Sequence, residues 1–403
     1  MDDPSPSHQR RAPVTATAEV FLAFLKLGLT AFGGPIAHIG FFREEFVVRR
    51  RWTDDAAFAD LVALCQFLPG PASSQVGLAL GLMRAGWLGG LAAFVGFTLP
   101  SALILFIVAL TASELPGELS SGVVDGLKLV AVAIIAHAVL GMARTLCPDR
   151  LRASIAVLAV IILAVLPAVY GMPLAILAGA SLGLWRGELP VATGAAIAVP
   201  VSRTAGVISL GLAVTVFIAL PIFASHSPAV ALADSFYRSG MLVFGGGHVV
   251  LPLLQVEVVE AGLVSLDAFL AGYGAAQAVP GPLFTFGAYL GAIMESGPSG
   301  LAGALIAMLS LFAPGFLLLV GTLPFWAGFR RHARARAIMA GANAAVVGIL
   351  GAALYDPVFT SAVTGFPEFT LALACFVLLV GWKCPPWLVV LLGAAGGGLL
   401  AIL

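Results

Sequence analysis

Two glycine- and proline-rich breaks recur about 211 residues apart, each inside an apolar stretch long enough to enter a membrane. The pattern FGGP at 32–35 returns as FGGG at 244–247, and QFLPGP at 66–71 returns as QAVPGP at 277–282. Glycine and proline interrupt helices, and lipid tolerates interrupted backbone only where protein or a water-filled cavity satisfies the freed polar groups. Paired breaks at matching positions of two halves therefore predict a substrate site between inverted repeats.

The composition requires a membrane environment. Of 403 residues, 60% are hydrophobic and only 10% are charged, so a water-soluble core could not hide the apolar surface. Twenty basic residues balance twenty acidic ones, and no overall field favours nucleic acid. The four cysteines show no CxxC spacing, which predicts buried free thiols and no metal site.

Basic loops predict the topology, because they stay on the cytoplasmic side. We interpret residues 1–18 as a cytoplasmic tail that carries Arg10 and Arg11. A second basic cluster, at 49–51, follows the first broken stretch, so both ends of that stretch should lie inside and it should form a re-entrant hairpin. The stretch 58–82 should form another. Two full crossings are the alternative, and they leave the chain on the same side.

Five crossings should separate the two copies, and an odd number inverts the second. We expect them near 86–111, 122–143, 153–169, 172–186 and 204–224. The second copy carries acidic residues where the first carries its arginine cluster, which agrees with inversion: Glu257, Glu260 and Asp267. Four more segments, near 300–324, 336–354, 368–381 and 385–403, place the C-terminus outside.

The predicted fold is thus an all-α polytopic membrane protein. It consists of two inverted-topology repeats, at 19–203 and 204–403, with Gly/Pro-broken re-entrant or discontinuous helices.

The helices that begin after the breaks are candidate anion sites. A helix N-terminus presents unpaired N–H groups and a partial positive charge without placing a full charge in lipid. The first PGP break is followed by Ser73 and Ser74, whereas the second offers only Thr285 as a hydroxyl. We therefore expect the first half to supply more polar contacts. The alternative is that the glycines simply permit close helix packing.

Four further polar side chains flank the breaks, and one lysine approaches them. His38 and His248 each follow a glycine pair and could titrate or donate to an oxyanion, although a buried neutral histidine is an equal alternative. Gln66 and Gln277 precede the PGP sequences, where an amide could bind the ligand or satisfy the loop. Lys26 lies within the first hairpin and is a candidate fixed cation.

The longer motifs resemble the chromate ion transporter family over nearly the whole chain after the tail. The first half carries FLKLGLTAFGGPIAHIGFFREEFV and DLVALCQFLPGPASSQVGLALGLMRAGWLGGLAAFVGFTLPS, and the second carries FGGGHVVLPLLQ and AAQAVPGPLFTFGAYLG. The resemblance implies efflux of chromate across a prokaryotic cytoplasmic membrane, and hence chromate resistance. Carried over by position, its signature includes, from our candidate site, Gly33, Gly34, His38, Gln66, Gly70, Gln75, Gly245, Gly246, His248, Gln277 and Gly281.

The leading hypothesis is a secondary transporter that holds a tetrahedral oxyanion between the halves. Moving a dianion outward down an inside-negative potential releases roughly 4.6 kcal/mol per 100 mV, so export needs no ATP. The chain contains no GxxxxGK[ST] sequence and no HExxH sequence, which disfavours a nucleotide-driven pump and a metalloenzyme, and no cofactor is expected. Sulfate transport, a passive anion channel, proton coupling through a histidine, and a homodimer all stay open.

Overall fold

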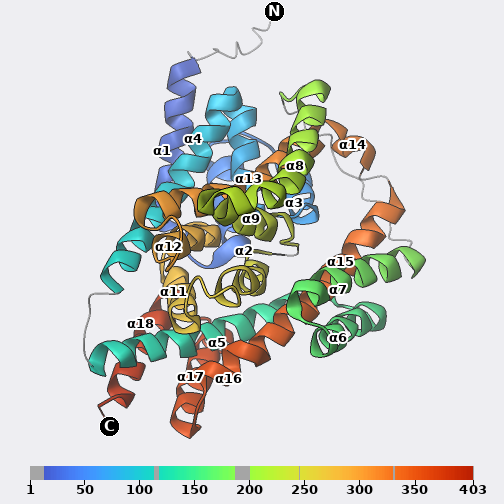
Figure 1. Ribbon diagram of the computed structural model, residues 1–403. Coiled ribbons are helices and arrows are strands. Elements are labelled where there is room, and N and C mark those ends of the chain that lie inside the picture. The colour runs from blue at the N-terminus through green and yellow to red at the C-terminus, as the bar shows by residue number, and fades with distance from the viewer. Residues whose placement is uncertain (1–12, 113–117, 187–199, 245, 330–331, 403) are drawn as a thin grey trace, which may run out of the picture.

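The protein is helical throughout the part that the computed structural model describes, which is residues 13–112, 118–186, 200–244, 246–329 and 332–402. No β-strand occurs within these ranges (Figure 1). Six of the described helices are long and apolar enough to cross a bilayer: Ala72–Thr111, Ser121–Leu146, Ala168–Trp185, Arg203–His226, Gly300–Phe325 and Ala333–Ala362. The chain is an all-α polytopic membrane protein, as its sequence predicts.

The first break reverses the direction of the chain. Helix α1 (Pro13–Thr30) ends just before Gly33 and Gly34, whose φ angles of 98° and 76° lie in the left-handed region that favours glycine. Helix α2 (Gly34–Phe42) then runs back and continues as a π-helical segment, η1 (Arg43–Arg49). A substitution at either glycine would strain this turn.

Two ion pairs confirm that the arms of this stretch are antiparallel. Lys26, late in α1, pairs with Glu45 at 3.0 Å, and Glu19, early in α1, pairs with Arg50 at 3.5 Å. The beginning of one arm therefore lies beside the end of the other. Antiparallel arms fit both the expected re-entrant hairpin and the alternative of two full crossings.

The second broken stretch forms another hairpin. Helix α3 (Asp55–Phe67) leads into the PGP loop, after which α4 (Ala72–Ala112) begins. The long helix α4 is itself folded back at Gly86, whose φ is 64°. The two arms of α4 pack so closely that a Cβ atom on Gly81 would collide with the carbonyl oxygen of Gly89. The second arm of α4 corresponds to the crossing predicted near 86–111.

The second half repeats this order of elements. A helix before the glycines, a broken return with a π-helical segment, a helix before the PGP loop, a short helix after it and a long crossing all recur. They are α9 (Pro228–Met241), η3 (Gly247–Val249), α10 (Val250–Leu254), η4 (Gln255–Val259), α11 (Leu266–Ala278), η5 (Leu283–Thr285), α12 (Phe286–Ala292) and α13 (Gly300–Thr322). Helix α8 (Arg203–Phe223), extended by η2 (Ala224–His226), precedes α9 and packs against α9 and α13.

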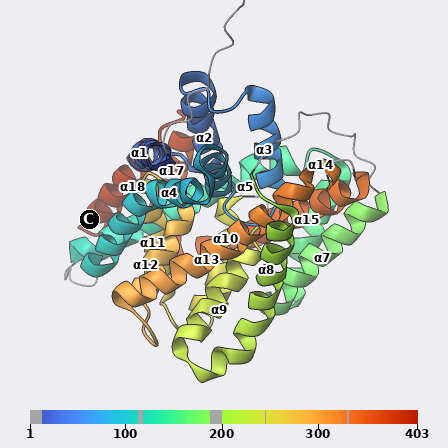
Figure 2. The ribbon, with the colours of Figure 1, turned by 90° about the horizontal axis from the view of Figure 1, so that it is seen from above.

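The last helices of each half pack against the other half. Helix α5 (Glu118–Leu146) contacts α17 (Phe366–Val380) and α18 (Pro386–Leu400), whereas α15 (Ala333–Ala353) contacts α6 (Arg150–Val165) and α7 (Ala168–Arg186). Helices α5 and α15 also contact each other in the lower part of the molecule (Figure 1). The view from above shows α17 and α18 beside α5 and α7 beside α15 (Figure 2). The halves are therefore interlocked.

One expected boundary shifts. The sequence suggests a segment over 153–169, but α6 ends at Val165 and Leu166 is extended, with φ −114° and ψ 144°. Proline at 167 disfavours helical geometry in the residue before it. The remaining described elements are short: η6 (Leu323–Phe325), α14 (Trp326–Phe329), η7 (Leu354–Phe359) and α16 (Thr360–Ala362).

Candidate functional site

Each PGP loop forms a backbone hydrogen bond to the glycine break of the other half. The N–H of Gly70 donates to the carbonyl of Val243 at 2.8 Å, and the N–H of Gly281 donates to the carbonyl of Ala31 at 2.9 Å. The two bonds are related by the duplication, because Gly70 corresponds to Gly281 and Ala31 to Val243. All four broken segments therefore meet in the interior, between the halves.

Only glycine fits at the centre of either loop. Gly70 and Gly281 have φ angles of 119° and 105°. A Cβ atom on Gly70 would lie 2.8 Å from the Cα of Gly315 in α13, and one on Gly281 would lie 2.8 Å from the hydroxyl of Ser101 in α4. Backbone thus approaches backbone at the first loop and a buried hydroxyl at the second.

The N-terminus of α4 presents polar groups at the first break. Its first backbone hydrogen bond runs from Gln75 N to Pro71 O at 2.9 Å, so the N–H groups from Ala72 to Ser74 come before the helical ladder. The hydroxyl of Ser74 is buried and has no hydrogen-bond partner in the described structure. An orphaned buried hydroxyl costs stability, so its presence at a helix N-terminus points to a ligand.

Gln75 connects the first loop to the second half. Its amide Nε2 donates to the carbonyl of Pro69 at 3.0 Å and to that of Gly315 at 2.8 Å. Its Oε1 is buried and has no partner among the described residues. The side chain therefore clamps the loop onto α13 and leaves an acceptor for a water or a proton-bearing ligand.

His38 is fully engaged within the protein. Its Nε2 lies 3.2 Å from the carbonyl of Ala31, and its Nδ1 lies 3.3 Å from the hydroxyl of Ser73. Because a carbonyl only accepts, Nε2 carries the hydrogen in the neutral ring, and Nδ1 accepts from Ser73. The ring also packs edge-on against Phe97, with 5.2 Å between centroids. His38 supports the carbonyl that receives the second PGP loop, which favours the structural alternative.

His248 faces the other half. Its Nδ1 lies 2.7 Å from the hydroxyl of the buried Tyr273. Its Nε2 would lie 3.8 Å from a Cβ atom placed on Gly34, so this nitrogen points at the first glycine break. Of the two histidines, His248 is the one directed between the halves.

The second helix N-terminus is less polar, as expected. The hydroxyl of Thr285 donates to the carbonyl of Pro282 at 2.7 Å and so closes its own turn. The two residues before Thr285 are Leu283 and Phe284, which are apolar and buried. Gln277 leaves its Nε2 buried and unpartnered in the described structure, whereas Gln66 is exposed at the end of α3. The two glutamines that the sequence treats alike therefore lie in different environments.

Lys26 lies in an ion pair and not beside the glycines. Its ammonium contacts Glu45 at 3.0 Å and is half exposed. The pair recurs 212 positions later, where Arg238 lies 3.7 Å from Glu257. In both halves, a cation on the helix before the glycines thus pairs with an acid on the π-helical segment after them. Gly246 has a φ of 144° in the second break, and Gly245 lies outside the described residues.

Glu45 is the charged centre of the first hairpin. Its carboxylate accepts hydrogen bonds from Arg50 at 2.8 Å and from Lys26 at 3.0 Å. Burial opposes ionisation, but these two cations outweigh it and hold the pKa of Glu45 below its ordinary value. The acid therefore stays ionised at neutral pH.

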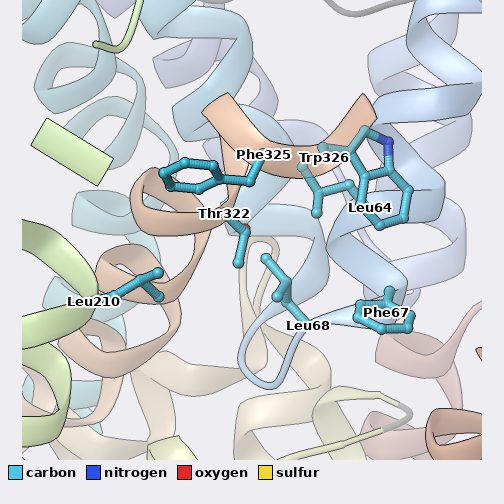
Figure 3. Close-up of a pocket in the computed structure, with 7 residues that line it drawn as sticks. All are labelled: Leu64, Phe67, Leu68, Leu210, Thr322, Phe325 and Trp326. Carbon is cyan, nitrogen blue, oxygen red and sulfur yellow. The ribbon is translucent and has the colours of Figure 1, made fainter. Parts of the chain in front are cut away.

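An apolar cavity of 260 Å³ lies beside the first PGP loop. It is lined by Leu64, Phe67, Leu68, Leu210, Thr322, Phe325 and Trp326 (Figure 3). The hydroxyl of Thr322 donates to the carbonyl of Leu318 at 2.8 Å, and the indole of Trp326 donates to Asp60 at 3.2 Å. The donors around this cavity are thus already used, and it suits hydrocarbon better than an oxyanion.

The expectation that the chain lacks a G-x-S-x-G sequence is wrong, because one occurs at 179–183, but it cannot act as a nucleophile elbow. That motif needs a sharp turn from a strand into a helix. Here it lies within α7, and the hydroxyl of Ser181 donates to the carbonyl of Leu177 at 2.8 Å. Both glycines pack against α15. The motif serves helix packing.

Sequence reasoning overlooked several contributors to the site. Tyr273, Ser101 and Gly315 contact the breaks from α11, α4 and α13. Thr98, one turn before Ser101, has a buried hydroxyl without a partner in the described structure. A polar residue within an apolar helix is the signal that could have found Thr98 and Ser101. No local signal marks Gly315 among the chain's many glycines.

Comparison with known proteins connects this geometry to one family. The sequence profile described as "Chromate transporter" matches residues 18–184 and 230–398. The chain is 29% identical to the chromate transport protein of Pseudomonas aeruginosa, over 95% of this chain and 92% of that protein. It is 28% identical to the probable chromate transport protein of Synechococcus elongatus, over 96% of each, and 26% identical to the chromate transport protein of Cupriavidus metallidurans, over 97% and 94%. No solved structure matches. Each matched region contains one copy of both breaks.

Proposed function

Because the chain belongs to the chromate transporter family, we propose that it exports chromate by secondary transport, holding the dianion where the four broken segments meet. The supporting observation is the orphaned hydroxyl of Ser74 at the N-terminus of α4, beside the crossed bonds of Gly70 and Gly281. Backbone N–H groups and hydroxyls can replace the water around an oxyanion without a fixed charge in lipid. Gln277 and His248 would complete the site from the second half.

The proposed cycle uses the two interlocked halves, at 19–203 and 204–403, as the bodies that move. Rocking of one half against the other would open the meeting point of the breaks alternately to each side. The N-terminus would lie in the cytoplasm of a prokaryotic cell and the C-terminus outside its inner membrane. An inside-negative potential of 100 mV would supply roughly 4.6 kcal/mol for each dianion exported, and chromate resistance would follow.

Uptake into inverted vesicles tests this proposal. Vesicles that contain the protein receive labelled chromate under an imposed potential, with and without a pH gradient and with excess sulfate. Saturable, protein-dependent accumulation that follows the potential is the expected result. Accumulation of sulfate alone would change the substrate, and accumulation that requires the pH gradient would make the carrier proton-coupled. Unsaturable flux without counterflow would indicate a channel and overturn the carrier mechanism.

A further inference from the structure

A second cavity, of 210 Å³, opens at the junction of the two halves near the end of α3. It lies between the C-terminal end of α3, the connection from α5 to α6, and one face of α15. Its lining consists of Phe67, Leu146, Arg152, Arg336, Met339, Ala340 and Asn343. The four residues from α15 are spaced as i, i+3, i+4 and i+7, so they form one face of that helix. Both halves thus contribute to this cavity.

The polar lining of this cavity suits a small anion. Arg152 comes from the first half and Arg336 from the second, and guanidinium groups bind oxyanions with several directed N–H donors. The Oδ1 atom of Asn343 is buried without a partner in the described structure. Turning that amide by 180° would place its donor Nδ2 at the same position. Two cations and an unsatisfied amide therefore line one cavity.

Asp149 reduces the positive charge beside Arg152. Asp149 Oδ2 lies 2.6 Å from Nε of Arg152, and Asp149 Oδ1 accepts the backbone N–H of Arg152 at 3.0 Å, which caps α6. The backbone bond and the guanidinium together lower the pKa of Asp149, so it is ionised at neutral pH. Asp149 thus offsets part of the positive charge that an anion in the cavity would meet.

The cavity extends from the basic helix ends toward the first break. Arg336 and Asn343 are seven residues apart, which is about 10 Å along α15. At the other wall stands Phe67, the last residue of α3, which also lines the apolar cavity and immediately precedes the loop that leads to Gly70. The basic residues around the mouth predict that it faces the cytoplasm.

We infer that this cavity is the cytoplasmic vestibule of the transporter, where Arg152 and Arg336 collect a tetrahedral oxyanion dianion before it passes Phe67 to the break at Gly70. The inference rests on the proposed function and adds an entry site to it. Chromate and sulfate share the recognised chemistry, so either anion can serve as a probe.

Transport kinetics of charge variants test the vestibule. We expect Arg152→Gln and Arg336→Gln to raise the half-saturation concentration for chromate roughly three- to tenfold, with a smaller change in maximal rate, because each removes one partly solvated charge contact. Asp149→Asn should lower that concentration, since asparagine keeps the helix cap and removes the competing charge. Damage to the fold would not improve apparent affinity. Arg334→Gln, exposed on the same helix and outside the lining, is the matched control and should change nothing.

A binding measurement separates this inference from the proposed function. In a Met339→Cys variant, sulfate should slow maleimide labelling of the new thiol, and adding Arg336→Gln should remove that protection. Unprotected labelling, or unchanged half-saturation in both Arg336→Gln and Asp149→Asn, would overturn the vestibule. If sulfate protects the thiol but the wild-type protein transports neither anion, the vestibule stands as an anion site and the proposed export fails.

Discussion

The two PGP loops have the same backbone and different surroundings. Gly70 and Gly281 both take positive φ angles and both donate to a carbonyl of the opposite break. After the first loop the chain continues with Ser73 and Ser74, but the aligned positions after the second hold Phe284 and Thr285. Backbone hydrogen bonds do not depend on side-chain identity, so both loops keep the same geometry. Only the helix N-terminus after the first loop carries two hydroxyl side chains.

The histidines show the same divergence. Both ring nitrogens of His38 form hydrogen bonds within the first half, to Ala31 and Ser73. His248 bonds Tyr273 through Nδ1 and turns Nε2 toward Gly34 in the opposite half. They occupy different positions in their repeats, because His248 aligns with Ile36. Similar motifs in a duplicated chain therefore need not perform the same role.

Substitution of the loop glycines should reduce transport more than any other change, and by the same amount in either half. Gly70→Val places carbon against the backbone of Gly315, Gly281→Val places carbon against the Ser101 side chain and the Phe97 carbonyl, and both force an unfavourable φ. We expect transport to be abolished while the protein still inserts in the membrane, measured as vesicle uptake normalised to protein content. Gly141→Ala is the control, because its Cβ would meet no atom within 4 Å. Transport that survives either valine variant would contradict the shared role of the loops.

Removing a hydroxyl at each of the two helix N-termini should affect transport and stability differently in the two halves. Ser74→Ala should lower the chromate transport rate about tenfold, since it removes one hydrogen bond to a desolvated anion. Its melting temperature should hold or rise, because that hydroxyl has no partner in the described structure. Thr285→Ala should instead lower thermal stability and affect transport less, because its hydroxyl bonds Pro282. Equal transport losses in the two variants would show that both N-termini contact the substrate.

Substitution of the two histidines should give different phenotypes. His38→Ala removes two buried hydrogen bonds and should destabilise the protein by about 1–3 kcal/mol, while the pH dependence of its residual transport stays that of the wild type. His248→Asn can keep the bond to Tyr273 and loses Nε2, so it should lower the transport rate with little loss of stability. Thermal unfolding in detergent and uptake between pH 5.5 and about 8 measure the two effects. A flattened profile in His38→Ala would reverse the assignment.

The hairpin ion pair should show the smallest effect. Because the folded protein lowers the pKa of Glu45, ionised Glu45 adds stability above its unfolded pKa, and that stability is lost as pH falls through the lower folded pKa. Glu45→Gln should therefore be less stable than the wild type at neutral pH by roughly 1 kcal/mol, with the difference shrinking toward pH 3. Melting temperatures across that range measure this. A gap that widened on acidification would contradict the lowered pKa.

Much of the architecture followed from local patterns. Apolar length predicted where helices form, although α6, α17 and α18 are shorter than the six helices long enough to cross a bilayer, and the breaks at Gly33, Gly70 and Gly281 fall where the sequence places them. These features are readable because helix interruption and the cost of charge in lipid act on a few neighbouring residues at a time.

The amino-acid sequence is enough to identify a duplicated, all-α membrane protein of the chromate transporter family, with four breaks and a more polar first half. Only the three-dimensional packing shows that each PGP loop bonds to the opposite break, that the last helices pack across the halves, and that His38 bonds through both ring nitrogens whereas His248 bonds Tyr273 through Nδ1. It also paired Lys26 with Glu45 and brought Arg152 and Arg336 to one cavity. Such contacts join residues tens to hundreds of positions apart, and their partners depend on how helices pack in three dimensions, which no local pattern encodes.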